Sequence, residues 1–352
     1  MPTLWFCLVA LMIAVYVVLD GFDLGAGIIH PGVAPTDAER RAVIASIAPV
    51  WDGNEVWLVA AGGTLFFAFP VLYASSFSGF YLPLMIVLWL LVLRGVSVEF
   101  RSLIAGPVWS PFFDLTFCLS SALLAIFFGA ALGNVVRGVP LDAQGYFFEP
   151  LWTNFRFGAD AGILDWYTIL VGVAAYFALA LHGALWVAFK CEAEVAARAR
   201  RIARLAVWAV LATALLVTLI SLRIQPQILL NLSGHPWGFV FPAIVIASLA
   251  GIFYYLRRGA APPNARRAFV HSCGYLLGML TSAAFGLYPY VLPARAGPAL
   301  SLSIYNARTS DRALRLGLAW WIVGISLAGV YFIFLYRRFA GPVGTGESHG
   351  YE

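Results

Sequence analysis

A group of acidic and basic side chains lies at the ends of three long apolar segments near the start of the chain. They are Asp20, Asp23, Asp52, Glu55, Arg94, Glu99 and Arg101. An ionisable group at membrane depth is costly unless it is paired or hydrated, so it marks a proton path, an ion site or a buried contact with a partner. These residues are therefore the strongest signal of function in the sequence.

The elements that must position these charges are membrane helices. Hydrophobic residues make up 62% of the 352, and charged residues only 11%. A helix needs about 20 apolar residues to cross a hydrocarbon core of about 30 Å. Windows of this kind predict nine spans, approximately 3–22, 50–72, 77–98, 112–132, 162–189, 204–222, 236–256, 268–290 and 314–338. The predicted fold class is an all-α polytopic membrane protein.

The spans are expected to form one membrane domain over residues 1–352. We predict a first four-helix bundle within 1–132, a second within 162–290, and a ninth, peripheral helix at 314–338. The longest connections, near 133–161 and 291–313, carry Pro, Gly and aromatic residues, and we expect them to lie outside the membrane and cap the bundle.

The charge pattern predicts the orientation. Most of the 22 Lys and Arg fall in alternate loops and the tail if the N-terminus lies outside, which places the C-terminus in the cytoplasm. No basic residue precedes the first apolar segment, so we interpret it as a retained helix and not a cleaved signal. The net charge of +5 comes from these loops, which favours contact with lipid headgroups over nucleic acid binding.

Topology brings the charges of the first three spans together on the cytoplasmic side. Asp20 and Asp23 are expected at the end of the first helix, where the macrodipole disfavours a carboxylate. A carboxylate that faces Arg94 or Arg101 could ionise there, whereas an unpaired one would hold its proton. Both states suit a proton relay; the alternative is a set of salt bridges that holds a turn closed.

Asp52 allows two interpretations. It could cap the start of the second span, with Glu55 three residues later completing a capping box. The local density of polar and aromatic residues favours a functional role instead, because Trp51, Asn54 and Trp57 lie close by in sequence.

Other reactive residues give weaker signals. Cys7, Cys118, Cys191 and Cys273 lack metal-binding or redox spacing, so no metal site is predicted. His182 is predicted to hydrogen bond to a neighbouring helix and not to ligate a haem.

Longer motifs give a specific resemblance. Val18-Leu-Asp-Gly-Phe-Asp-Leu-Gly-Ala-Gly27, Pro49-Val-Trp-Asp-Gly-Asn-Glu-Val-Trp-Leu58 and Arg94-Gly-Val-Ser-Val-Glu-Phe-Arg-Ser102 closely resemble subunit II of the cytochrome bd-type quinol oxidases. Gly286-Leu-Tyr-Pro-Tyr290 and Ser301-Leu-Ser-Ile-Tyr-Asn-Ala307 are similar to the family's stretch before its last helix. The resemblance covers the whole chain.

The resemblance implies a subunit of a terminal oxidase in the bacterial inner membrane. Its obligate partner would be subunit I, which holds haem b and haem d and oxidises quinol outside, while protons for O2 reduction come from the cytoplasm without a pump. Asp20, Asp23, Asp52, Glu55 and Glu99 would be proton-transfer candidates. The candidates for the haem-side interface would be Trp51, Asp52, Asn54, Arg94 and Arg101.

Several points stay open. The residues at Tyr305-Asn-Ala307 are more similar to the cyanide-insensitive branch of this oxidase family. The resemblance leaves room for a structural quinone in this chain and for a small single-helix third subunit. The alternative function is a proton-coupled secondary transporter, which would bind its substrate near the bilayer midplane.

Overall fold

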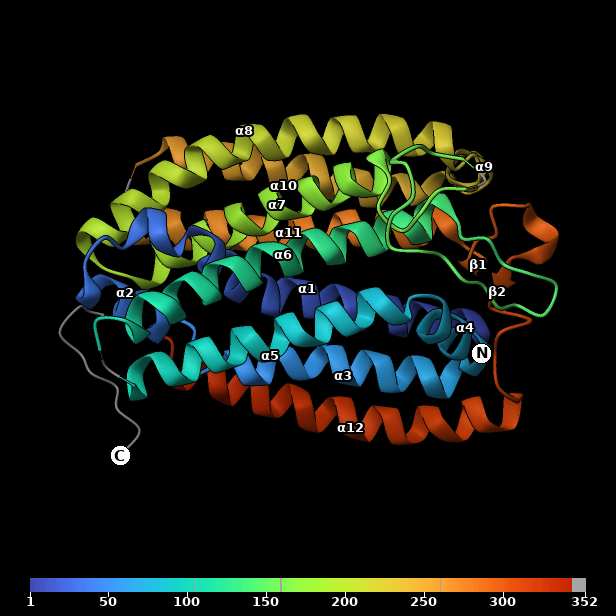
Figure 1. The fold of residues 1–352 in the computed structure, drawn as a ribbon, viewed down its shortest axis with the longest axis horizontal. Coiled ribbons are helices and arrows are strands. Elements are labelled where there is room, and N and C mark those ends of the chain that lie inside the picture. The colour runs from blue at the N-terminus through green and yellow to red at the C-terminus, as the bar shows by residue number, and fades with distance from the viewer. Residues whose placement is uncertain (105, 159, 260, 344–352) are drawn as a thin grey trace.

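The computed structural model describes residues 1–104, 106–158, 160–259 and 261–343, so residues 344–352 of the predicted domain lie outside it. Long helices lie side by side, with short elements at their ends (Figure 1). The helices are α1 (Pro2–Val33), α2 (Asp37–Ala45), α3 (Trp51–Ala68), α4 (Pro70–Gly79), α5 (Tyr81–Leu103), α6 (Trp109–Arg137), α7 (Trp166–Lys190), α8 (Ala193–Ile224), α9 (Gln227–Gly234), α10 (Val240–Arg257), α11 (Pro262–Leu287) and α12 (Asp311–Arg338). Two 3₁₀ turns, η1 (Pro236–Phe239) and η2 (Pro298–Leu300), accompany an antiparallel pair of strands, β1 (Tyr290–Leu292) and β2 (Leu302–Ser303).

Among the described residues, eight helices are long and apolar enough to cross a membrane, which confirms the all-α polytopic class. The predicted span 50–72 falls on α3 and the start of α4. Polar residues occupy the first turn of α3, and the helix ends where Pro70 begins α4, because proline cannot continue a helix from within. Nine spans and the division into two four-helix bundles therefore stay predictions.

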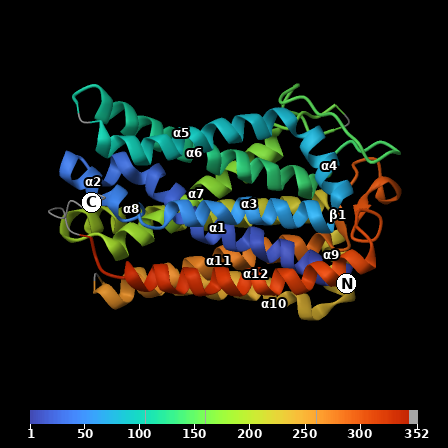
Figure 2. The same cartoon turned by 90° about the horizontal axis from the view of Figure 1, so that it is seen from below.

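The short elements gather at the two ends of the long helices (Figure 1). We call one the α2 end, where α2 and the α10–α11 connection lie, and the other the β1–β2 end, where the N-terminus, α4 and α9 lie. Helix α12 runs along the edge of the bundle beside α3 (Figures 1 and 2). Only 6% of its most apolar window is buried, so most of its surface faces away from the chain.

Helix α1 is longer than predicted. It runs from Pro2 to Val33, and every residue from Asp20 to His30 is buried. The expectation that Asp20 and Asp23 end the first helix is wrong, because the glycines that follow them are packing positions inside it. The macrodipole argument therefore does not apply to these two carboxylates.

The glycines let α1 and α7 approach closely. A Cβ added to Gly25 would lie 2.6 Å from the backbone nitrogen of Gly183 and against the carbonyl oxygen of Leu179. Small residues at a crossing of this kind let membrane helices pack backbone to backbone.

We expect Gly25→Ala to destabilise the protein by about 2–3 kcal/mol, because the backbone of α7 cannot move aside without disturbing the core. Thermal unfolding of the detergent-solubilised protein would measure the loss. Gly324→Ala on α12 is the control, since a Cβ there meets nothing within 4 Å. Equal melting temperatures for the two variants would contradict the close crossing.

The two long connections meet at the β1–β2 end. The backbone nitrogen of Val139 donates to Pro293 O at 3.0 Å, and the nitrogen of Arg295 donates to Val139 O at 2.8 Å. Phe147 packs against Gly79 and Phe80. The loops after α6 and after α11 thus cover this end of the bundle together, as the sequence predicted.

Candidate functional site

The first candidate site is built around Arg94 of α5. Its guanidinium donates to Asp20 Oδ1 of α1 at 2.6 Å and to Glu55 Oε2 of α3 at 2.8 Å. The side chains of Arg94 and Asp20 are almost completely buried, whereas that of Glu55 is 23% exposed. Mutual attraction offsets part of the cost of removing these charges from water. We call these three residues the Arg94 cluster.

Asp23 lies next to this cluster on the same face of α1, three residues beyond Asp20. Asn54 of α3 donates from Nδ2 to Asp23 Oδ2 at 2.8 Å, and the Tyr336 hydroxyl of α12 donates to Asn54 Oδ1 at 2.8 Å. One amide therefore joins α1, α3 and α12.

One carboxylate oxygen of each of these two buried aspartates lacks a donor. Within the described residues, Asp20 Oδ2 and Asp23 Oδ1 accept no hydrogen bond. A buried polar atom without a partner is costly, and a carboxyl group can relieve that cost by binding a proton. Asp20 and Asp23 thus lie near a buried positive charge, each with one oxygen that accepts no hydrogen bond within the described residues.

The remaining α3 residues of the prediction lie around this core. The Trp51 indole donates from Nε1 to Glu99 Oε1 at 3.2 Å, and the Arg94 guanidinium lies 5.9 Å from the Trp51 ring centre. Asp52 is exposed in the first turn of α3. The capping-box alternative for Asp52 is wrong, because Val50 occupies the N-cap and no side chain caps this helix.

Arg101 does not join the Arg94 cluster, contrary to expectation. It lies two helical turns further along α5 and donates to Asp114 Oδ1 of α6 at 2.6 Å and to Asp37 Oδ1 of α2 at 2.8 Å. Asp114 also accepts from His30 at 2.9 Å and from Arg40 at 2.9 Å. These residues form a second network, at the α2 end.

Asp37 gives this network a pH dependence. The hydrogen bond from Arg101 holds the pKa of Asp37 below its usual range, so the pair stabilises the fold above pH about 3.9 and is lost as the pH falls further. We expect Asp37→Asn to cost no more than about 1 kcal/mol at neutral pH, since the side chain is largely exposed. Melting temperatures of wild type and variant should converge below pH about 4; a gap independent of pH would contradict this account.

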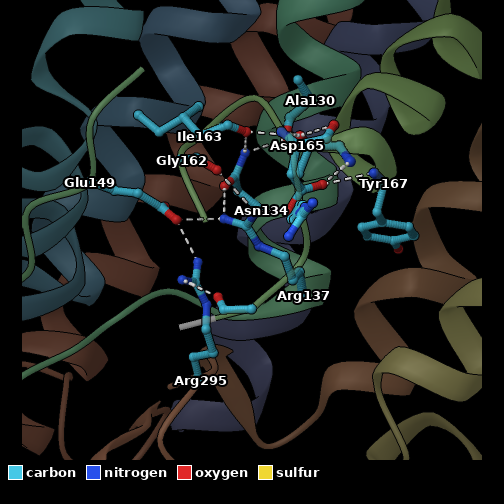
Figure 3. Close-up of polar contacts among 12 residues, drawn as sticks. Ala130, Asn134, Arg137, Glu149, Gly162, Ile163, Asp165, Tyr167 and Arg295 are labelled. Carbon is cyan, nitrogen blue, oxygen red and sulfur yellow. Dashed lines mark hydrogen bonds and ion pairs between the residues drawn. The ribbon is translucent and has the colours of Figure 1, made fainter. Parts of the chain in front are cut away.

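A third network lies at the β1–β2 end (Figure 3). Arg137 of α6 forms an ion pair with Asp165 and donates to Glu149 Oε1 at 2.7 Å. Arg295 donates to the same Glu149 oxygen at 2.5 Å, and Asp165 caps α7 by accepting from the backbone nitrogens of its first turn. Burial raises the pKa of Glu149 although both arginines oppose it. This network ties α6, α7 and both long loops together.

Sequence reasoning missed the second and third networks. Asp114 and Arg137 lie at the two ends of one long apolar helix, which is the pattern that marks a paired charge. Their partners come from α1, α2, α5, the start of α7 and a long loop, and no spacing along the chain relates these to α6. The one signal in the sequence was the presence of a charged residue near each end of this apolar helix.

The fold and its buried ion pairs define a polytopic helical membrane protein that holds charges between its spans. The model of the family "Cytochrome bd terminal oxidase subunit II" matches residues 1–339, and the chain belongs to this family.

Relatives of this family match the chain over nearly its whole length. The chain is 31% identical to the "Probable cytochrome oxidase subunit 2" of Haemophilus influenzae, over 96% of this chain and 94% of the relative. It is 30% identical to the "Cytochrome bd-I ubiquinol oxidase subunit 2" of Escherichia coli strain K12, over 97% and 94%. A solved structure of the bd oxidase from Geobacillus thermodenitrificans contains a chain of the same fold, with a TM-score of 0.74, 21% identity, and coverage of 96% of this chain and 98% of that one.

Membership of this family establishes the general function of the protein. The protein is a multi-pass subunit of a quinol oxidase complex in the inner membrane, where it takes part in electron transport and has subunit I as its partner. Haem and quinol belong to the complex as a whole.

His182, which lies well inside a span, does not fit an axial haem ligand within this chain. His182 lies 2.7 Å from Ser272 Oγ and 2.9 Å from Val18 O, so neighbouring helices occupy both ring nitrogens. This confirms the hydrogen-bonding role predicted for His182. His30 is fully buried against Asp114, and the His271 ring stacks on Tyr255.

Proposed function

We propose that this subunit supports the haem-bearing subunit I and passes protons from the cytoplasm toward the partner's haems through the Arg94 cluster and Asp23. The observation that carries the proposal is the pair of buried carboxylates, Asp20 and Asp23, each with an oxygen that accepts no hydrogen bond within the described residues. Such groups can change protonation without breaking the bonds that hold the helices together. Glu55, which is partly exposed, gives the cluster contact with the outside of the chain.

The route begins at the α2 end in this proposal. This end carries Arg40, Arg101 and the basic start of α8, which the positive-inside rule assigns to the cytoplasm. The N-terminus would then face the periplasm and the C-terminus the cytoplasm. Quinol oxidised on one side and protons taken up from the other would separate charge without a pump.

Helix α3 is the proposed contact with subunit I. Asp52, Val56 and Val59 are exposed on its outer side, and Val59 is 73% exposed. Trp51 and Asn54 belong to the same helix, whereas Arg94 and Arg101, the other predicted interface residues, are buried on α5. Haem b and haem d would be held mainly by subunit I, since both ring nitrogens of His182 are already engaged.

A reduced-minus-oxidised visible spectrum of the tagged protein, purified in mild detergent, tests the assembly part of the proposal. Bands of b-type haem and of a red-shifted chlorin, together with a larger copurifying chain, are the expected result. A colourless, solitary protein would contradict it and would favour the transporter. Mass spectrometry of the same sample would detect a quinone or a small third subunit, both of which the resemblance allows.

A further inference from the structure

A hollow of about 470 Å³ opens at the α2 end, outside the networks described above. It is lined by Phe189 at the end of α7 and by Pro263, Arg266, Arg267, Val270 and His271 of α11. One side of the hollow is basic and the other apolar. Arg266 and Arg267 are exposed, and Val270 is 58% exposed.

The charges around this hollow have no counter-charge nearby in sequence. From Val195 to Ser310 the chain contains no Asp or Glu, although Arg200, Arg201, Arg204, Arg257, Arg258, Arg266 and Arg267 all fall in this stretch. These arginines belong to the first part of α8, the end of α10 and the start of α11, which lie at the same end of the protein (Figure 1). The negative charge that balances them must therefore come from outside this part of the chain.

Local packing fixes the basic side of the hollow. The Arg267 guanidinium lies 5.7 Å from the Tyr255 ring centre, and the His271 ring stacks on the same tyrosine at 5.5 Å. The aromatic ring thus orders two of the donors, which lowers the entropy lost when they bind an anion.

We propose that this hollow binds the phosphate headgroup of an anionic phospholipid, with an acyl chain along Phe189 and Val270. The hollow lies at the end of a membrane span, where arginines and headgroups share one layer, and basic pockets between helices at this depth suit such lipids. A soluble anion would leave the apolar side without a partner. The site is separate from the proposed proton route.

The test uses the delipidated complex and native mass spectrometry during titration with phosphatidylglycerol. We expect Arg266→Gln/Arg267→Gln to weaken binding about 30-fold, because each arginine near the headgroup layer contributes about fivefold. The control is Arg201→Gln/Arg204→Gln, which removes the same charge from the same end but outside the hollow, and it should stay within about twofold.

The outcomes separate the alternatives. Unchanged binding in the first variant, or equal weakening in both, would overturn the proposal, as would displacement of the lipid by inorganic phosphate or equal affinity for phosphatidylcholine. If the double variant fails to assemble, Val270→Asp provides the second test, since its exposed side chain would place a negative charge in the hollow. It should weaken phosphatidylglycerol binding at unchanged haem content, and full binding would contradict the site.

Discussion

Replacing Asp20 by Asn is expected to slow O2 reduction about 100-fold, a typical loss for removal of a proton-transferring group, while the purified complex keeps its haem. Asparagine has nearly the same shape and can still accept a hydrogen bond from Arg94, which also retains Glu55. It cannot bind and release a proton. The measurement is O2 uptake per haem with saturating quinol, alongside the visible spectrum.

Two further variants make this result specific. Asp37→Asn introduces the same chemical change on an exposed carboxylate of α2 and should leave turnover at the wild-type rate. Asp52→Asn should slow turnover less than Asp20→Asn, because Asp52 lies exposed at the edge of the site. Full O2 uptake by an Asp20→Asn complex with full haem content would refute the relay.

Replacing Arg137 by Met is expected to destabilise the protein by about 3–5 kcal/mol, because it leaves the buried carboxylates of Asp165 and Glu149 without their central cation. The side chains of all three are 1% exposed or less. The expected result is a large loss of assembled complex and a lower melting temperature of what remains.

The control for this prediction is Arg308→Gln in the same loop region. Arg308 pairs with Asp311, whose side chain is 57% exposed, so the loss should stay below about 1 kcal/mol. If both variants melted alike, the network shown in Figure 3 would have no special role in stability.

The class of protein and the main site could be predicted from the sequence for a physical reason. A charged side chain in an apolar membrane helix requires a partner of opposite charge or water. Asp20, Glu55 and Arg94 meet because each belongs to a different helix of the bundle and each requires a partner away from water. The position of these residues within their helices was less predictable. The glycines after Asp23 could have ended α1, and only contact with Gly183 of α7 shows that they pack inside it.

The sequence did not predict which charged residues of different helices form ion pairs. Arg94 and Arg101 lie two turns apart on α5 and looked equivalent, yet Arg94 meets Asp20 and Glu55. Arg101 instead meets Asp114 of α6 and Asp37 of α2. Glu149 and Arg295 belong to loops whose meeting depends on the whole fold. Tertiary contacts of this kind leave no periodic pattern in the chain.

Side-specific proton uptake tests the central claim most directly. The complex would be reconstituted in liposomes with a pH indicator on the side of the α2 end, and uptake would be followed after O2 is added to the reduced enzyme. We predict that wild type takes protons from this side and that Asp20→Asn does so about 100-fold more slowly at unchanged haem content. Uptake at the wild-type rate in the variant, or uptake from the β1–β2 side, would contradict the account.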